Sequence, residues 1–316
     1  MRIVDEAGTR AATPWPDLID AIGAMLAGGA GRAPDRHVHP IGLPGGADGA
    51  LLLMPSWVDG DVLGVKTVTY VPTNQGTDVP TVNASYQLFD GTDGRLVAVI
   101  DGDELTARRT AAISALAARS LARPDAANLL VMGTGQVAPN AARAYATVRP
   151  ITRIEVWGRN PDAAARTAAE LAAEGLPASP TGDPERSAGE ADIVTCATGA
   201  TAPIVNGAWL RPGTHLDLIG SFQDDMRESD DEAVGQATVF VDSMAGALLA
   251  GDLAQPIRDG VLAREAIAGD LRDLVTGAHP GRRDDAERTV FKSAGFALAD
   301  LAAARLVLAS TAPPTA

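Results

Sequence analysis

The sequence predicts an α/β protein of two domains, on three observations. Residues 37–100 hold short β-rich runs separated by turns rich in glycine and aspartate, which is typical of an antiparallel sheet. From residue 124 onward strand-like and helix-like segments alternate, which indicates a parallel sheet covered by helices. A glycine-rich turn at 133–138 joins the first strand of this second region to its helix.

Length and charge limit the classes of protein to which the chain can belong. Its 316 residues are enough for two ordinary domains with apolar cores. The net charge of −14 disfavours nucleic acids and anionic membranes as partners, because both are negative themselves. No apolar run approaches the roughly 20 residues of a spanning helix, and MRIVDEAGTR carries acids where a signal peptide is apolar. We expect a cytoplasmic protein.

Metal-binding side chains are few. The single cysteine, Cys196, excludes an internal disulfide and any site that needs several cysteine ligands. The four histidines show no spacing that would place them together on one helix. The sequence predicts no metal site.

The first third of the chain begins with a helix and continues as a sheet. Residues 13–29 open with prolines, repeat apolar residues at helical spacing and end at a glycine pair, which predicts a short amphipathic helix. The predicted strands are LLLMPSWV, VLGVKTVTYV, TVNASYQLFD and RLVAVI. Residues 103–124 then predict a long helix that Pro124 ends.

The rest of the chain alternates between strands and helices. Helices are predicted from about Pro139 and over 161–174, and strands at LLVMG, IEVWG, DIVTCAT, THLDLIGS and ATVFVDS. RTVFKSAGFALADLAAARLVLAS predicts a strand and then a long alanine-rich helix, and PPTA a frayed end.

The turn GTGQVA contains Gly133-x-Gly135-x-x-Ala138. It follows an apolar strand, opens a helix and precedes a second strand, which is the context of a Rossmann-type dinucleotide site. The glycines permit close approach of the backbone to a pyrophosphate, and the helix N-terminus stabilises its charge. The alternative is a glycine turn of an ordinary β-α-β unit. We predict a nicotinamide-nucleotide site.

The end of the second strand bears on which nucleotide binds. NAD enzymes usually place an acid there, against the ribose hydroxyls. In IEVWGRN that place holds Gly158, and Arg159 follows. An arginine can pair with a 2′-phosphate that an acid would repel, although a solvated loop arginine is the alternative. The sequence favours NADPH, with NADH possible.

The helix at 103–124 carries an arginine on its apolar stripe. Leu105, Arg109, Ile113 and Leu116 share one face, whereas Arg108 falls on another and can point to water. A guanidinium that faces the core is costly unless an anion meets it. Either a buried ion pair, a snorkelling side chain or a carboxylate receptor in a cleft would explain Arg109.

Lysine is rare in this chain. Lys66 and Lys292 are the only lysines among 26 basic residues. On composition alone, Lys66 could lie on a solvated strand face. Arginine could supply the same charge, but not a compact amine that can lose its proton.

A series of short stretches covers nearly the whole chain. In order they read LMPSWV, GVKTV, PTV, LFDGTDGRLVAVIDGDELTARRTAA, LARPDA, GTGQVA, GDL and VFKSAGFALADLAAA. This series resembles the ornithine cyclodeaminase/mu-crystallin family, most specifically from GVKTV to GTGQVA. The resemblance implies a Rossmann NAD(P)-binding domain at 121–292. It also implies an α+β domain, formed by 1–120 with 293–316, that binds substrate and pairs sheets across a homodimer.

The resemblance also implies the site residues. In the family, two arginines, the lysine of the GVK-like strand and a threonine surround the substrate carboxylate, and these match Arg36, Lys66, Thr81 and Arg109 here. Lys66 is also the candidate catalytic residue. The residues implied at the cofactor are Thr110, Gly133, Thr134, Gly135, Gln136, Val137, Arg159, Asn160, Ala197, Thr198 and Ser293, with Lys292 beside the last.

One stretch departs from the family pattern. Cyclodeaminases carry an aspartate just after a glycine pair at the carboxyl edge of the sheet. Here LIGSFQDDMRE has Phe222 at that place, and Asp224 or Asp225 could substitute only if the loop shifted register. A phenylalanine cannot take a proton, so this departure and Arg159 both favour the reductase branch.

The resemblance therefore implies an NAD(P)H-dependent ketimine reductase. It would convert Δ1-pyrroline-2-carboxylate or Δ1-piperideine-2-carboxylate to L-proline or L-pipecolate. Lys66 would donate a proton if neighbouring arginines lower its pKa. The alternatives are an ornithine or lysine cyclodeaminase, an amino-acid dehydrogenase, and a mu-crystallin-like protein that binds NADPH and a small molecule without turnover.

Overall fold

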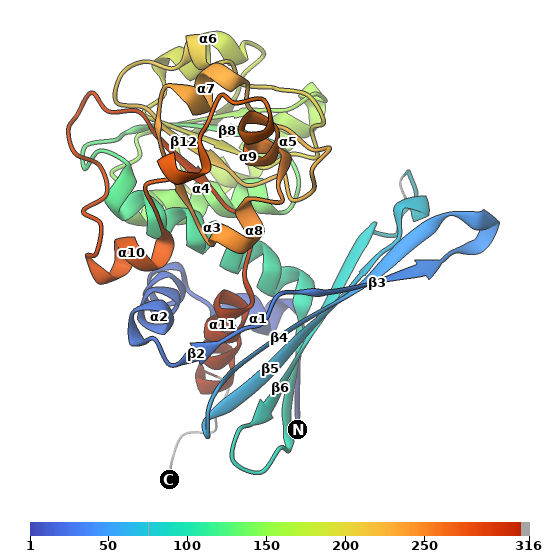
Figure 1. Cartoon of the computed structure of the whole chain (residues 1–316). Helices are drawn as coiled ribbons and strands as arrows, with labels where there is room; N and C mark the ends of the chain where they lie inside the picture. Colours follow the sequence, from blue (N-terminus) through green and yellow to red (C-terminus); the bar gives the residue numbers. More distant parts are fainter. Residues whose placement is uncertain (75, 311–316) are drawn as a thin grey trace. The chain divides into compact units, whose positions relative to one another are not determined.

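The computed structural model describes residues 1–74 and 76–310 and divides into two compact units (Figure 1). One unit comprises Met1–Arg109 and the C-terminal segment that begins at Phe296; the other comprises Thr110–Gly295. The first boundary falls inside a helix, whereas the sequence placed it after residue 120. The predicted frayed end, PPTA, lies outside the described residues.

The first unit is built on a seven-stranded sheet, with β3 attached beside the path β1-β7-β6-β5-β4-β2. The predicted β-rich runs form its antiparallel centre, because each is joined to the next by a short turn. The strands are β1 (Arg2–Val4), β2 (Gly31–Arg32), β3 (His37–Gly42), β4 (Asp48–Val58), β5 (Val62–Tyr70), β6 (Val82–Asp90) and β7 (Leu96–Asp101).

Register decides which face of β5 is buried. Val62, Gly64 and Lys66 alternate along the strand and are all buried, and Lys66 is paired with Met54 on β4 and Tyr86 on β6. Gly64 makes room for a neighbour, since a Cβ there would lie 2.0 Å from the hydroxyl of Tyr86. The lysine therefore points into the core and not to water.

Three helices of this unit lie beside its sheet (Figure 1): α1 (Glu6–Ala12), α2 (Trp15–Gly28) and α11 (Ala297–Ser310). The predicted amphipathic helix at 13–29 is confirmed as α2, which ends at Gly29 with a left-handed φ of 67°. Helix α11 packs against α2, β4 and β5. Its alanines and leucines are apolar on nearly every side, which is typical of a helix buried on all sides.

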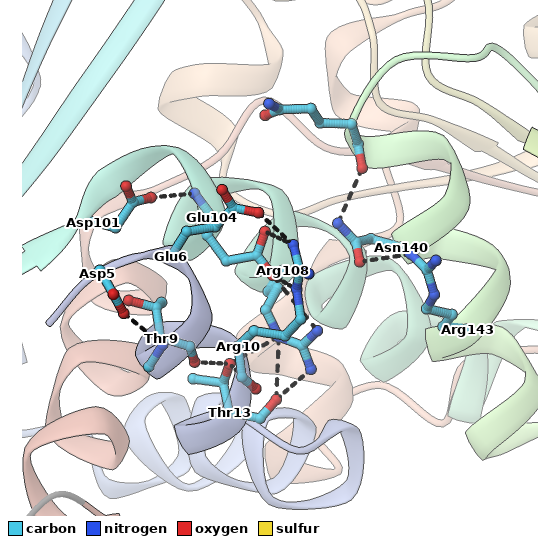
Figure 2. A network of polar contacts seen from close by, with 12 residues as sticks. Asp5, Glu6, Thr9, Arg10, Thr13, Asp101, Glu104, Arg108, Asn140 and Arg143 are labelled. Atoms are coloured by element: carbon cyan, nitrogen blue, oxygen red, sulfur yellow. Dashed lines mark hydrogen bonds and ion pairs between the residues drawn. The ribbon is translucent and has the colours of Figure 1, made fainter. Parts of the chain in front are cut away.

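The prediction for Arg108 was wrong. It lies on α3 (Gly102–Leu121) and is only 6% exposed. Its guanidinium donates to the Thr13 carbonyl at 2.5 Å and to the Thr13 hydroxyl at 2.8 Å (Figure 2), and it lies 4.0 Å from the centre of the Trp15 ring. The segment that joins α1 to α2 covers this face of α3, which the periodicity of α3 alone does not reveal.

Ion pairs extend this contact to α1. Arg10 donates to Glu104 at 2.8 Å and to Glu6 at 2.6 Å, and Glu104 lies 3.8 Å from Arg108 (Figure 2). The start of α3 is thereby joined to the N-terminal helices by charged groups of both signs.

The second unit contains a parallel eight-stranded sheet in the order β10-β9-β8-β11-β12-β15-β13-β14, as the alternating pattern predicted. Its strands are β8 (Asn128–Met132), β9 (Arg153–Trp157), β10 (Ala178–Pro180), β11 (Ile193–Cys196), β12 (His215–Leu218), β13 (Thr238–Val241), β14 (Gly269–Asp270) and β15 (Thr289–Lys292). Strands β8 and β11 are neighbours, although β9 and β10 come between them in the chain. In open parallel sheets a ligand crevice lies at such a reversal of strand order, which here falls at the carboxyl ends of β8 and β11.

The helices of the second unit connect these strands. They are α4 (Val137–Val148), α5 (Pro161–Ala173), α6 (Pro184–Glu190), α7 (Asp231–Gly235), α8 (Met244–Ala247), α9 (Gly251–Arg258) and α10 (Leu271–Thr276). The sequence did not predict α6 to α10, which are too short to repeat an apolar pattern. Short 3₁₀ turns lie at Pro44–Gly46, Pro72–Asn74, Gly207–Trp209 and Arg264–Ala266. None of the described helices has both the length and the apolar character needed to cross a membrane.

Candidate active site

A buried charge cluster lies in the first unit, where β5, α3 and α11 meet. Asp300 on α11 has one carboxylate oxygen, Oδ1, that accepts from Lys66 Nζ at 3.0 Å and from Arg109 Nε at 2.7 Å. Its other oxygen is 2.9 Å from the same ammonium. The three residues are at most 5% exposed. The sequence predicted that Lys66 and Arg109 act together, but it assigned no role to Asp300.

The cluster carries more positive than negative charge. Two cations and one carboxylate leave a net charge of one positive unit in the interior, where an unbalanced charge is costly. Arg109 Nη1 is also buried and has no hydrogen-bond acceptor within the described structure. An unsatisfied buried donor costs about 1–3 kcal/mol. The buried ion pair that the sequence left open is therefore present, and it retains a donor for one further anion.

The protonation of Lys66 is sensitive to this environment. Burial, together with the charges of Arg109 and Arg36, lowers the pKa of Lys66 to about 8, although Asp300 acts in the opposite direction. Burial alone would raise the pKa of Asp300, but Arg109 and Lys66 together hold it below its usual range. Asp300 is thus a carboxylate at neutral pH, and Lys66 is an ammonium that loses its proton in mildly alkaline solution.

The structure brings together three of the four residues expected at the substrate carboxylate. Arg36 is half-buried just before β3, and its charge acts on Lys66. Thr81 lies just before β6, five positions from Tyr86, the residue paired with Lys66. At about 3.4 Å per residue, Thr81 is about 17 Å along the strand from this cluster. It is not part of the group that surrounds Asp300.

The glycine turn of the second unit has the geometry of a phosphate-binding loop. Gly133 has a φ of 133°, and a Cβ there would lie 2.4 Å from the Ala197 carbonyl. Gly135 faces open space, and no side chain caps the N-terminus of α4. Asn140 stabilises the first turn by donating to the Gln136 carbonyl at 3.0 Å (Figure 2). A close backbone approach and uncapped helix amides fit a pyrophosphate.

The loop after β9 leaves an arginine available. Arg159 is exposed and makes no hydrogen bond or ion pair with any described residue. Asn160 is occupied locally, because its Oδ1 caps α5 by accepting from the amides of Asp162 and Ala163. Gly158 is packed, since a Cβ there would lie 2.8 Å from Thr134 Cγ2. Arg159 can therefore meet an anionic group that the rest of the loop does not supply.

The remaining residues implied at the cofactor differ in how they are placed. Thr134, Gln136 and Val137 belong to the turn and the start of α4, and Ala197 and Thr198 to the loop after β11. Thr110 is 8% exposed on α3. Ser293 is 1% exposed and donates to Asp242 at 3.1 Å, and Lys292 is fully buried. The hydroxyl of Ser293 and the amine of Lys292 thus have partners within the protein.

The loop after β12 contains Phe222 at the position where the family resemblance implies the aspartate of a cyclodeaminase. Phe222 occupies that place and is 42% exposed. Asp224 is exposed and lies 3.2 Å from Arg258, so it is paired elsewhere. Asp225 is also exposed.

Comparison with known proteins gives consistent matches over nearly the whole chain. A family model described as the ornithine cyclodeaminase/mu-crystallin family matches residues 21–312. A Δ1-pyrroline-2-carboxylate reductase of Paracoccus denitrificans (strain Pd 1222) is 40% identical over 291 residues, which cover 91% of this chain and 90% of that protein.

Two solved structures are similar over the same extent. The Thermococcus litoralis Δ1-pyrroline-2-carboxylate reductase in complex with NADH and L-proline has a TM-score of 0.92 at 31% identity, covering 98% of this chain and 97% of its own. An archaeal alanine dehydrogenase dimer with bound NAD has a TM-score of 0.88 at 25% identity, covering 98% of this chain and 95% of that chain.

The two glycines of the loop should respond differently to alanine. Gly133→Ala places a Cβ against the Ala197 carbonyl at a strained φ, so we expect a lower urea midpoint of unfolding. Gly135→Ala meets no protein atom within 4 Å and should leave that midpoint unchanged, but weaken NADH binding measured by fluorescence. Unchanged NADH affinity of folded Gly135→Ala would contradict the assignment of this turn to the pyrophosphate.

Proposed function

Because the chain belongs to the ornithine cyclodeaminase/mu-crystallin family, we propose that it is an NAD(P)H-dependent ketimine reductase. Its substrate is a small cyclic imine carboxylate, Δ1-pyrroline-2-carboxylate or Δ1-piperideine-2-carboxylate, and its product is L-proline or L-pipecolate. The observation that carries this proposal is the buried Lys66–Asp300–Arg109 cluster, with its excess positive charge and the unsatisfied Nη1 of Arg109.

The substrate carboxylate binds to this cluster. It accepts from Arg109 Nη1 and balances the positive charge that Asp300 leaves uncompensated. Arg36 adds a further positive charge. Asp300 is a positioning residue, because it holds the ammonium of Lys66 and the guanidinium of Arg109 in one orientation before the substrate arrives. Such preorganisation lowers the ordering cost of binding.

Lys66 supplies a proton to the imine nitrogen. At neutral pH it is protonated, and its lowered pKa of about 8 makes proton transfer easier than from an ordinary lysine. A protonated imine accepts hydride more readily at carbon, and a bound nicotinamide dinucleotide supplies that hydride. The protein contributes binding, orientation and the proton.

The dinucleotide is held in the second unit by the turn at Gly133–Gly135, the N-terminus of α4 and the loop at Ala197–Thr198. The exposed and unpaired Arg159 supports NADPH. The similar Thermococcus enzyme was solved with NADH. The Arg159 variant described below tests whether this chain prefers NADPH or NADH.

We also propose a homodimer. Val38, Leu63, Val79 and Val82 are exposed apolar side chains on or beside the sheet of the first unit, and exposed apolar side chains on a sheet suit contact with another copy. The similar alanine dehydrogenase was solved as a dimer. A cytoplasmic location remains a prediction.

Oxidation of NADPH and NADH, followed at 340 nm with each cyclic imine, tests the proposed function. We expect steady turnover with at least one imine and no ammonia release from L-ornithine or L-lysine, because Phe222 cannot act as an acid or base. Ammonia release would establish a cyclodeaminase. Reduction of pyruvate with ammonia and no imine turnover would establish an amino-acid dehydrogenase, and tight NADPH binding without any turnover a binding protein.

Lys66 should make the reaction depend on pH. As pH rises through about 8, the amine loses its proton and its charge, so kcat/KM should fall. Lys66→Met should lower kcat by about 10²–10⁴-fold, the usual contribution of a general acid. Lys66→Arg keeps the charge, so it should bind substrate but lose the fall near pH 8. If Lys66→Met raises only KM, the proton-donor role is wrong. Arg95→Met, at an exposed turn, is the matched control.

Arg159 should set the choice of dinucleotide. Arg159→Asp removes the partner of a 2′-phosphate and places an acid near the ribose hydroxyls, so we expect the ratio of kcat/KM for NADPH over NADH to fall at least about tenfold. Arg166→Asp on α5 changes the net charge equally at another exposed position and should leave the ratio unchanged. An unchanged ratio in Arg159→Asp would refute the role of Arg159.

A further inference from the structure

A second chain of buried charges lies in the second unit, at the ends of β12 and β15. Lys292 Nζ donates to Asp252 Oδ2 and to the Leu218 carbonyl, each at 3.0 Å. The other oxygen of Asp252 accepts from the backbone amide of Glu228 at 2.7 Å. Lys292, Asp252 and Glu228 are all 0% exposed. The proposed reaction uses none of them.

The carboxylate of Glu228 ties two loops together. Its Oε1 accepts from the amide and the hydroxyl of Thr198, at 2.7 and 2.8 Å, and its Oε2 accepts from the Gly220 amide at 2.6 Å. Thr198 follows β11, and Gly220 follows β12. The two backbones touch, because a Cβ on Gly220 would lie 2.0 Å from the Thr198 carbonyl. An ionised carboxylate thus accepts two hydrogen bonds from the loop after β11 and one from the loop after β12.

The loop held in this way forms one side of the dinucleotide crevice. A Cβ on Gly133 would lie 2.4 Å from the Ala197 carbonyl and 3.4 Å from Thr198 Cγ2. The glycine turn and the Thr198 loop therefore pack directly against each other at the carboxyl ends of β8 and β11. A displacement of the Thr198 loop would change the shape of the crevice.

We propose that the ionised carboxylate of Glu228 holds the Thr198 loop in the position that binds the dinucleotide, so that proton uptake by Glu228 weakens dinucleotide binding. Glu228 is a positioning residue in this role, since it acts through the Thr198 loop. The inference rests on the dinucleotide binding of the proposed function, but not on the reaction or the imine substrate.

The charges around Glu228 explain why it can take up a proton. Asp252 on α9 and Lys292 on β15 face it. Two carboxylates therefore share one ammonium, and these three side chains together carry a net charge of one negative unit when Glu228 is ionised. Burial, and after it the charge of Asp252, raises the pKa of Glu228 to about 7, although Lys292 and the Thr198 hydrogen bonds act in the opposite direction. From β11, Cys196 stays a neutral thiol, because burial raises its pKa well above the usual value. On β12, burial raises the pKa of Asp217 to about 6.

The sign of the effect follows from these groups. Below pH 7 Glu228 gains a proton, and a protonated carboxyl presents an O–H where the carboxylate accepted an N–H or O–H. Protonation also removes the negative charge, so the three charge-assisted hydrogen bonds to Thr198 and Gly220 become weaker. If only the ionised form binds, the dissociation constant of NADH rises about tenfold between pH 8 and pH 6.

Fluorescence titration of the full chain with NADH at pH 6, 7 and 8 tests this inference. Wild type should show the tenfold change. Glu228→Gln places an amide N–H opposite the donor of Gly220 or Thr198, so at pH 8 it should bind NADH about tenfold more weakly, with little dependence on pH. Glu232→Gln, an exposed acid four residues away, should behave as wild type. A folded Glu228→Gln with wild-type affinity and pH dependence would overturn the inference.

Proton release gives a second measurement that needs no variant. Calorimetric titration near pH 7 in buffers of different ionisation enthalpy should show net proton release when NADH binds, because the raised pKa of Glu228 leaves part of it protonated in the free protein. No release, together with a constant affinity from pH 6 to 8, would overturn the inference even if Glu228→Gln fails to fold. Absence of NADH and NADPH binding at every pH would instead refute the proposed function.

Discussion

The hydrogen bonds of Asp300 with Lys66 and Arg109 are the interaction on which the arrangement of the first unit depends. Each group is buried, and none would be stable there without the others, because an isolated charge in the interior is strongly disfavoured. Asp300 lies 234 residues after Lys66 in the chain. Helix α11, the last helix, must therefore pack on β4, β5 and α2 before either cation has a partner. The small alanine side chains of α11 let it approach these elements closely. The fold of the first unit and the proposed substrate site therefore both require that α11 packs in this position.

The same physical principle operates with opposite sign in the second unit. Around Asp300, one carboxylate faces two cations, and the unbalanced positive charge suits a substrate carboxylate. Around Lys292, one cation faces two carboxylates, and the unbalanced negative charge suits a proton. Complete neutralisation would make either cluster more stable, but it would leave nothing to bind. In the roles we propose, the first cluster uses its unbalanced charge to bind an anion and the second uses it to take up a proton.

Local sequence pattern predicted much of the architecture. The alternation of the β-rich runs, the glycine stop after α2 and the context of the Gly133–Gly135 turn are all confirmed, because each depends on residues close together in the chain. The inward direction of Arg109 is also confirmed, because it lies on the apolar stripe of α3 and is 5% exposed. The burial of Arg108 was not predicted. Its partners Thr13 and Trp15 belong to a distant segment of the chain, and the periodicity of α3 does not show that this segment packs against it.

The sequence by itself determined the fold class, the family, the strand that carries Lys66 and the helix that carries Arg109. These follow from periodicity, turn residues and short motifs, which act over one or two elements. Only the tertiary structure decided which acid balances the cations, and that Glu228 and Asp252 join Lys292 in a buried chain. A charge within an apolar helix, as at Asp300, indicates that some partner must exist. It cannot identify that partner, because electrostatic pairing depends on distance in space and not on separation along the chain.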